Sequence, residues 1–199
     1  AIVINANPVP VISGDNVVCA NEAGVVYSTP SAGNTYDWTV TGATSFTGDG
    51  SNTITVTWGA AGPGTVVLQE STASCSVTTG SYNVTINANP SPVITSSNTT
   101  VCAGATGETY SVVASGNTYS WTVTGGSITA GAGTNSITVT WGGGAGGTVG
   151  ITETSAAGCS GSASQAIVIN ANPVPVISGD NVVGANEAGA GYTTARAGK

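Results

Sequence analysis

Apolar and polar residues alternate along several short stretches of this chain. In residues 35–40, Tyr36, Trp38 and Val40 alternate with threonine and aspartate, and residues 53–58 alternate isoleucine, valine and tryptophan with threonine. Alternation of this kind places apolar side chains on one face of a strand and polar side chains on the other. We therefore predict two half-buried antiparallel strands whose tryptophans lie in a core.

The same patterns return in residues 119–123 and 137–141, which gives two tryptophans to each half of the chain. Further inward faces are predicted in residues 66–68 and 149–151, and no stretch has helical periodicity. Turn residues interrupt the pattern at roughly ten-residue intervals, as in β-sandwiches with Greek-key connections. We also expect an opening edge strand at Pro8–Ile12, a strand at Val17–Thr29, a turn at Gly59–Gly64 and a final strand at Tyr82–Ile86.

A long repeat organises the chain. Residues Ala1–Val18 return unchanged at Ala166–Val183, an offset of 165, and the tetrapeptide NANP recurs at offsets of 82 and 83. A fixed period means that the fold is read per repeat. We predict the last strand of an earlier module in residues 1–7, β-sandwich modules at 8–89 and 90–172, and the opening strands of an incomplete third module at 173–199. The short proline-containing linkers favour an extended rod.

The composition excludes several partners. The formal net charge is −7, and the two basic residues, Arg196 and Lys199, stand at the end of the chain. Binding of nucleic acid or of an anionic membrane surface needs clustered Lys or Arg, so neither partner is expected. No apolar run is long enough to span a membrane, and the first residues lack the basic region of a signal peptide. Four cysteines and the absence of His and Met favour an oxidising, extracellular or cell-surface location.

The four cysteines occupy matching places in the two repeats. Cys19 and Cys75 lie 56 positions apart, and Cys102 and Cys159 lie 57 apart. Matching positions favour one pairing within each repeat, Cys19 with Cys75 and Cys102 with Cys159. A metal or redox pair is the alternative, but the chain has no His and no CxxC motif. The third repeat has Gly184 in place of its first cysteine.

Six sequence blocks, in the same order and spacing in both repeats, resemble the PKD-like, immunoglobulin-related repeats of bacterial secreted and surface proteins. In the second repeat they are Val101–Gly104, Gly116–Gly125, Gly133–Gly142, Gly147–Val149, Glu153 and Gly158–Cys159. The first repeat follows them at Asn34–Gly42 and Ser51–Gly59. The resemblance implies an all-β, immunoglobulin-like fold in a spacer or adhesive stalk, not an enzyme. Cys75 departs from the immunoglobulin pattern, because it comes near the end of its strand, and its bridge is expected to clip one end of the sandwich.

Candidate site residues are few. Glu70 and Glu153 recur in register on the inward side of a strand, and we interpret both as buried carboxylates that accept backbone N–H bonds from a nearby loop. A catalytic acid would need a second placed group, and none is evident. Gly48–Asn52 has one acid where a calcium loop needs several oxygen donors, so a tight turn is predicted.

Acidic residues near the junction of each module with the preceding one offer a weaker alternative. Asp15, Glu22 and their copies Asp180 and Glu187 are placed where a shared cation would bind. The second repeat has Ser97 and only Glu108 nearby, so its junction would differ. Sequons at Asn83 and Asn98 are compatible with a surface location. We predict no catalytic, metal or cofactor site.

The leading hypothesis is a structural subunit of an extracellular filament or surface stalk, in which copies of the chain follow one another head to tail. A two-module axial repeat would follow from the offset of 165 residues. The alternative is a binding module of an adhesin, with a surface glycan or a protein as ligand. Sugar sites usually expose aromatic rings, and every tryptophan here falls on an inward position.

Overall fold

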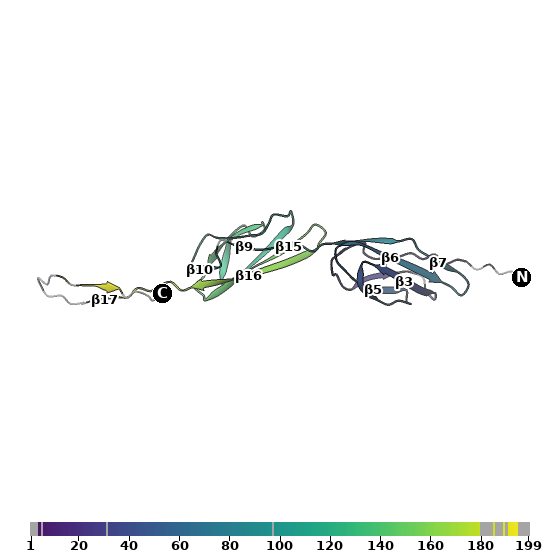
Figure 1. Cartoon of the computed structure of the whole chain (residues 1–199), viewed down its shortest axis with the longest axis horizontal. Coiled ribbons are helices and arrows are strands. Elements are labelled where there is room, and N and C mark those ends of the chain that lie inside the picture. Colours follow the sequence, from purple (N-terminus) through teal and green to yellow (C-terminus); the bar gives the residue numbers. More distant parts are fainter. Residues whose placement is uncertain are drawn as a thin grey trace.

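A computed structural model of the chain describes residues 4, 6–30, 32–96, 98–179, 185, 189 and 191–194. Two β-sandwich modules lie end to end in a rod, and a thin hairpin extends beyond the second module (Figure 1). All regular structure in the described residues is β-strand, as the alternation predicts, and none of it is a helix that would cross a membrane.

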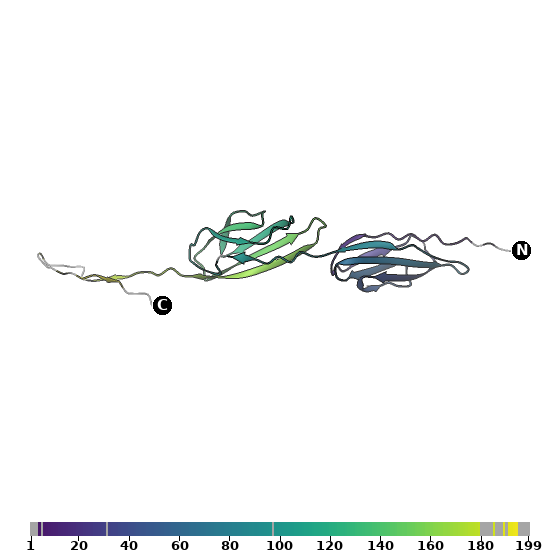
Figure 2. The same cartoon turned by 45° about the horizontal axis from the view of Figure 1, so that its top comes forward.

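The first module pairs two sheets, which appear as stacked layers in Figure 2. One sheet has the order β1-β8-β6-β3, with β7 added to β6, and the other has the order β2-β5-β4. All pairings are antiparallel except that of β1 with β8. The strands are β1 (Val17–Cys19), β2 (Val25–Ser28), β3 (Thr35–Thr41), β4 (Ala43–Thr47), β5 (Thr53–Trp58), β6 (Gly62–Ser71), β7 (Ser76–Thr78) and β8 (Tyr82–Asn87).

The second module repeats this arrangement with sheets β10-β16-β15-β12 and β13-β14-β11-β9. Its β10 is parallel to β16, as β1 is to β8. The strands are β9 (Thr95–Ser96), β10 (Thr100–Cys102), β11 (Glu108–Ser111), β12 (Thr118–Thr124), β13 (Gly126–Ala130), β14 (Ser136–Trp141), β15 (Gly146–Thr154) and β16 (Ser160–Asn170). The single strand β16 occupies the place of β7 and β8 together.

Each module has its own core, built on the predicted inward faces. The four tryptophans are 0–7% exposed. Trp58 packs edge-to-face on Tyr27 with ring centroids 5.9 Å apart, and Trp141 packs on Tyr110 at 6.0 Å. Buried aromatic pairs of this geometry combine a large apolar area with a favourable ring orientation.

The predicted turn at Gly59–Gly64 is shorter than expected. Strand β6 already begins at Gly62, so part of the glycine-rich stretch is strand. The ring of Trp58 explains Gly64, because a Cβ atom there would lie 2.5 Å from the tryptophan Cζ3 atom. Gly147 has the same relation to Trp141, at 2.4 Å. These glycines therefore let a strand backbone pass directly over the buried indole.

The prediction of one strand at Val17–Thr29 is wrong. The segment forms β1 in one sheet and β2 in the other, and the chain crosses between the sheets in the intervening turn. Asn21 and Gly24 have φ values of 62° and 79° in that turn, a conformation that asparagine and glycine adopt more readily than other residues. The turn places Cys19 at the end of β1, next to the boundary with the second module.

The proline-rich opening segment, Pro8–Ile12, is not the edge strand that was predicted, because its two prolines lack the backbone N–H groups that a ladder needs. Before β1 it makes one isolated bridge, Ser13 with Ser28. The tail repeats this pairing in β17 (Ile177–Ser178) and β18 (Thr193–Thr194), where Ser178 faces Thr193. In the first module Ile12 and Tyr27, which flank this pairing, lie in or against the core. Their counterparts in the tail, Ile177 and Tyr192, are exposed.

Candidate functional site at the module junction

The junction between the modules is a short linker, Ala88–Pro90, that follows the end of β8. The Asn89 side chain turns back and donates a hydrogen bond of 3.0 Å to the carbonyl of Ala20 in its own module. The Ala20 amide in turn donates to the carbonyl of Asn87. The second asparagine of NANP therefore fastens the linker to the end of the first module.

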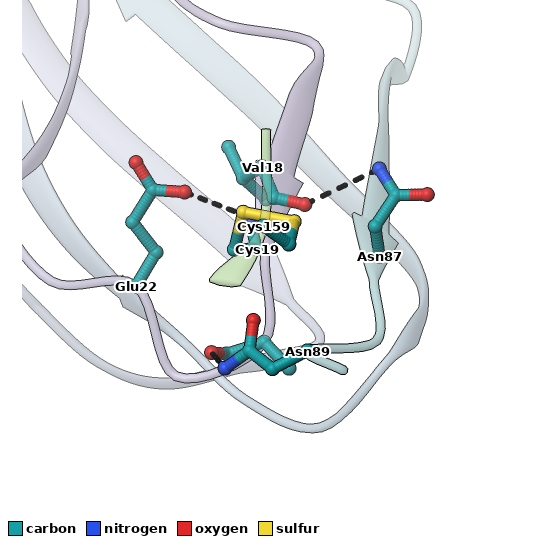
Figure 3. The surroundings of a disulfide bond; sticks show 7 residues. Val18, Cys19, Glu22, Asn87, Asn89 and Cys159 are labelled. Carbon is teal, nitrogen blue, oxygen red and sulfur yellow. Dashed lines mark hydrogen bonds between the residues drawn. A yellow bond between two sulfur atoms is a disulfide. The ribbon is translucent and has the colours of Figure 1, made fainter. Parts of the chain in front are cut away.

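A disulfide joins the two modules at this place. Cys19, at the end of β1, is bonded to Cys159, in the turn between β15 and β16, with Cα atoms 5.4 Å apart (Figure 3). It is the one disulfide among the described residues. The bridge ties the end of one sandwich to the near end of the next.

The predicted pairing of cysteines within each repeat is therefore wrong, and strand direction explains why. Strand β1 runs parallel to β8, so Cys19 lies at the end of the module where β8 leaves it. Strand β6 runs antiparallel to β8, so Cys75, which follows β6, lies at the opposite end. Nine residue steps along β6 correspond to roughly 30 Å, and a disulfide needs Cα atoms within about 7 Å. The bridge does not clip one end of a single sandwich but joins two sandwiches.

Close packing of the linker accompanies the bridge. A Cβ atom on Gly161, at the start of β16, would lie 1.8 Å from the carbonyl oxygen of Pro90. Only glycine leaves room for this approach, because any other side chain would displace the linker backbone. The first module has Val77 at the matching position of β7.

Glu22 lies beside the bridge and accepts a hydrogen bond of 2.7 Å from the Cys19 amide (Figure 3). The sequence interpretation placed this acid near the boundary with the preceding module, but it lies at the boundary with the following one. Groups of three or more His, Cys, Asp or Glu residues able to hold a metal are not found within the described ranges. Asp180 and Glu187, the proposed copies, lie outside those ranges.

The recurrent glutamates are buried, as predicted from strand parity, with Glu70 0% and Glu153 4% exposed. Among the described residues their donors are side chains and not the expected backbone amides. Asn34 donates to Glu70, while Ser115 and Asn117 donate to Glu153, the latter at 3.1 Å. Each carboxylate therefore anchors the loop that precedes the strand carrying the first tryptophan of its module.

An open groove of about 260 Å³ lies over Glu153 and continues onto the linker. Pro90–Val93 form one side, and Val113 on the other side is 84% exposed. Val93 is also largely exposed. A groove lined by apolar side chains and one carboxylate has the make-up of a ligand site.

The predicted turn at Gly48–Asn52 is present, with Gly48 and Gly50 at φ values of 92° and 85°. No sequence pattern indicates the role of its aspartate. Asp49 accepts a hydrogen bond of 3.0 Å from the backbone amide of Trp38, which pins the turn to β3. The two sequon asparagines, Asn83 and Asn98, are exposed.

Two buried tyrosines, one in each module, have raised pKa values. The Tyr27 hydroxyl donates to the carbonyl of Asp15 at 2.7 Å, and burial raises its pKa to about 12. Burial also raises the pKa of Tyr110 in the second module. Both hydroxyls act as neutral donors inside a core, which is a structural role.

Comparisons with known proteins agree with this architecture of two tandem modules. The sequence model of PKD-like domains matches residues 5–86 and 87–169. No match is found among curated proteins. An intimin fragment in complex with the intimin-binding domain of its translocated receptor is a similar solved structure, with 15% identity, a TM-score of 0.45, and coverage of 87% of this chain and 67% of the fragment.

Two further solved structures are more distant. Fibronectin(III)-like modules of CbhA from Clostridium thermocellum share 9% identity, with a TM-score of 0.38 and coverage of 81% of this chain and 95% of theirs. The adhesin InvE of Yersinia pseudotuberculosis shares 14% identity, with a TM-score of 0.30 and coverage of 78% and 58%. Similarities this low transfer no ligand. The family match spans most of the chain, which therefore belongs to the PKD-like domain family and contains two such domains in tandem.

Proposed function

We propose that this chain is a stiff structural segment of an extracellular filament or cell-surface stalk. The observation that carries the proposal is the junction, where a disulfide, a three-residue linker and the packing of Pro90 on Gly161 fix one module to the next. Adjacent domains usually move relative to each other unless their interface is strong. A covalent link here has no role in a single sandwich and a clear role in a rod.

The surface supports the same proposal. The chain is acidic, with only 6% charged residues, and its outward strand positions are mostly threonine, serine and asparagine. The disulfide supports an extracellular or cell-surface location, because disulfides form and persist in oxidising compartments. We infer module boundaries at 8–89 and 90–172. The hairpin formed by β17 and β18 is then the opening of a further module, because its Ser178–Thr193 pairing repeats Ser13–Ser28.

The fixed junction is tested by the relative mobility of the modules in solution. Residual dipolar couplings of the oxidised protein should fit one alignment tensor for both modules. The Cys19→Ser variant is the matched comparison and should need two tensors, because linker and packing alone then hold the modules. Two independent tensors for the oxidised wild-type protein would contradict a stiff segment.

A second candidate function is ligand binding by an adhesin, and the groove over Glu153 favours it. Its walls present Val93 and Val113 to solvent beside a buried carboxylate. The double change Val93→Asp and Val113→Asp would add charge to the groove without touching the core. A glycan array and a protein-binding screen with both proteins test this function: binding that the double variant abolishes would support it, and equal binding by both proteins would exclude the groove.

A further inference from the structure

We propose that the free edge of β12 in the second module pairs with the same edge of a second copy of this chain, so that two rods associate side by side. The proposal goes beyond the proposed function, because a stiff segment need not bind sideways. In the sheet β10-β16-β15-β12, strand β12 has a neighbouring strand on one side only. A sheet edge offers unpaired N–H and C=O groups to another strand, and natural proteins usually protect it.

In the first module the matching edge strand, β3, is protected by an aspartate. The Trp38 amide points away from the neighbouring strand β6, because Leu68, which lies opposite Trp38, directs both of its backbone groups to Thr79 on the far side. Asp49, in the turn after β4, accepts the Trp38 N–H at 3.0 Å. A strand arriving at this edge would have to displace the carboxylate from the amide.

A second aspartate protects β3 by its charge. Asp37 is exposed on the outer face of this strand, between the exposed Thr35 and Thr39. Two copies paired through β3 would bring the carboxylates of Asp37 and Asp49 together near the contact. Like charges across paired strands are destabilising. The first module is therefore poorly suited to edge-to-edge pairing.

The second module lacks both aspartates. Ser120 stands in place of Asp37, and Ala132 stands in place of Asp49. Both of these side chains are exposed. The rest of the edge strand is unchanged, since both modules read Thr-Tyr before the substituted position and Trp-Thr-Val-Thr after it. The two modules therefore differ at the positions that protect the edge.

The Trp121 amide is consequently left without a cap. Trp121 lies opposite Ile151 in the register that Trp38 has in the first module, so its amide also points away from the sheet. Its indole N–H donates to the carbonyl of Thr134 at 2.8 Å, whereas within the described residues its backbone N–H has no hydrogen-bond partner. An edge amide without a partner is a group to which an added strand can bond.

The distribution of charge favours a second copy as the occupant of this edge. Residues 8–89 include five acidic residues, whereas residues 90–172 include two, Glu108 and Glu153. Glu153 is buried, and neither acid belongs to β12. Neither module has a basic residue that would attract an acidic partner. Net charge keeps proteins apart, and this repulsion is weakest between two second modules.

Strand β12 is also complementary to itself. An antiparallel pair with its two-fold axis at Trp121 lets the two Trp121 residues exchange N–H···O bonds. On the outer face, Ser120 then lies opposite Thr122 of the second copy. Thr118 likewise lies opposite Thr124 of the second copy. Pairs of serine and threonine across strands stabilise a sheet by hydrogen bonding.

Sedimentation equilibrium of the full chain tests the pairing, with free thiols alkylated so that no covalent dimer forms. The variant Ser120→Asp/Ala132→Asp gives the second module both acids of the first, which folds with them. Its dimer should be weakened by about tenfold, because each change enters twice in a two-fold contact. Ser164→Asp/Ala166→Asp is the matched control. It adds the same charge at exposed positions of β16, away from the edge, and should change the dissociation constant by less than about twofold.

Hydrogen exchange of 15N-labelled protein locates the contact. The Trp121 amide should exchange about tenfold more slowly at concentrations where the dimer prevails, because it gains a partner. The Trp38 amide is the internal control and should not change, since Asp49 already caps it. A dimer that leaves the exchange of the Trp121 amide unchanged would contradict pairing through β12.

A wild-type protein that stays monomeric at every concentration would overturn the proposal. Equal weakening by the edge variant and its control would also overturn it, because charge alone would then explain the effect. Protection of the Trp121 amide only on addition of an extended peptide of another sequence would show that a second copy is not the occupant. The residual dipolar couplings of the monomer test the structural segment separately, so a rigid monomer without a dimer removes only this pairing.

Discussion

The end of the first module and the end of the second are built alike but differ in what they bind. In both, a parallel strand ends in cysteine, and an asparagine side chain donates a hydrogen bond of 3.0 Å to an alanine carbonyl. In both, a tryptophan amide also donates a hydrogen bond to the turn that follows the cysteine. Within the part of the chain that the structure describes, only the first has a complete neighbouring module on it. The comparison shows that the disulfide belongs to the boundary between modules and not to the sandwich itself.

One substitution distinguishes the two ends. Glu22 accepts a hydrogen bond of 2.7 Å from the Cys19 amide, and Ala105 takes its place in the second module. The backbone of the turn is nevertheless the same, since Trp58 donates to the carbonyl of Glu22 and Trp141 to that of Ala105, both at 2.8 Å. The acid therefore supports the turn but is not needed to form it.

The largest effect is expected on removing the bridge. Cys19→Ser frees a loop whose ends are 140 residues apart, and the chain-entropy account gives a loss of up to about 5 kcal/mol in the free energy of unfolding. One cooperative transition should separate into two in denaturant titrations. Cys102→Ser is the control and should change stability by less than about 0.5 kcal/mol, because its side chain is exposed. Equal losses for both variants would place the bridge elsewhere.

A smaller loss is expected from crowding the junction. In Gly161→Ala, the new Cβ atom overlaps the carbonyl of Pro90, and the displacement should cost about 1–3 kcal/mol and rotate the modules relative to each other. Gly133→Ala is the matched control, since its Cβ atom meets nothing within 4 Å. Chemical denaturation and residual dipolar couplings measure the two effects, and an unchanged orientation in Gly161→Ala would argue against tight packing at the linker.

The two linker asparagines sharpen the comparison further. Asn89→Ala and Asn172→Ala each remove one hydrogen bond, with a loss of about 1 kcal/mol. Only Asn89→Ala should also loosen the orientation of the modules, because Asn172 has no second module after it in the described chain. A loosened orientation in both variants would show that these residues do not act locally.

The smallest effect at ordinary pH comes from the buried tyrosines. The pKa of Tyr27 is raised from 10.0 to about 12, so neutral Tyr27 stabilises the first module fully below pH 10. That contribution should be lost as pH rises from 10 to about 12. Thermal melts of the oxidised protein measure this loss as a fall of the melting temperature between pH 10 and about 12, and the fall should be smaller in Tyr27→Phe. An equal fall in both proteins would assign the alkaline loss to other groups.

Strand alternation was enough to predict the inward strand faces and the two cores, because burial of Trp38, Trp58, Trp121 and Trp141 depends on local parity. The pairing of cysteines was not predictable in the same way. It depends on β1 being parallel to β8 while β6 is antiparallel to it, which is a property of the whole sheet. The break between β1 and β2 was also missed, since valines on both sides of Ala20–Gly24 continue the apolar pattern.

Glu70 and Glu153 were predictable in part. Their inward direction followed from strand parity, but their donors come from loops 36 residues away in sequence, at Asn34 and Asn117. Contacts between distant loops carry no periodic signal. An Asn-Thr-Tyr sequence is repeated at the start of β3 and of β12, and it was the one sequence feature that pointed to these loops.

Disulfide mapping with a protease that cleaves after glutamate tests the central claim most directly. Cleavage after Glu22, Glu70, Glu108 and Glu153 places Cys19 in peptide 1–22, both Cys75 and Cys102 in peptide 71–108, and Cys159 in the peptide that begins at residue 154. The monomer, alkylated and digested without reduction, should yield peptide 1–22 bonded directly to the Cys159 peptide, with peptide 71–108 separate. A single cluster in which peptide 71–108 joins the other two would mean that each module closes its own bridge, and it would contradict the account.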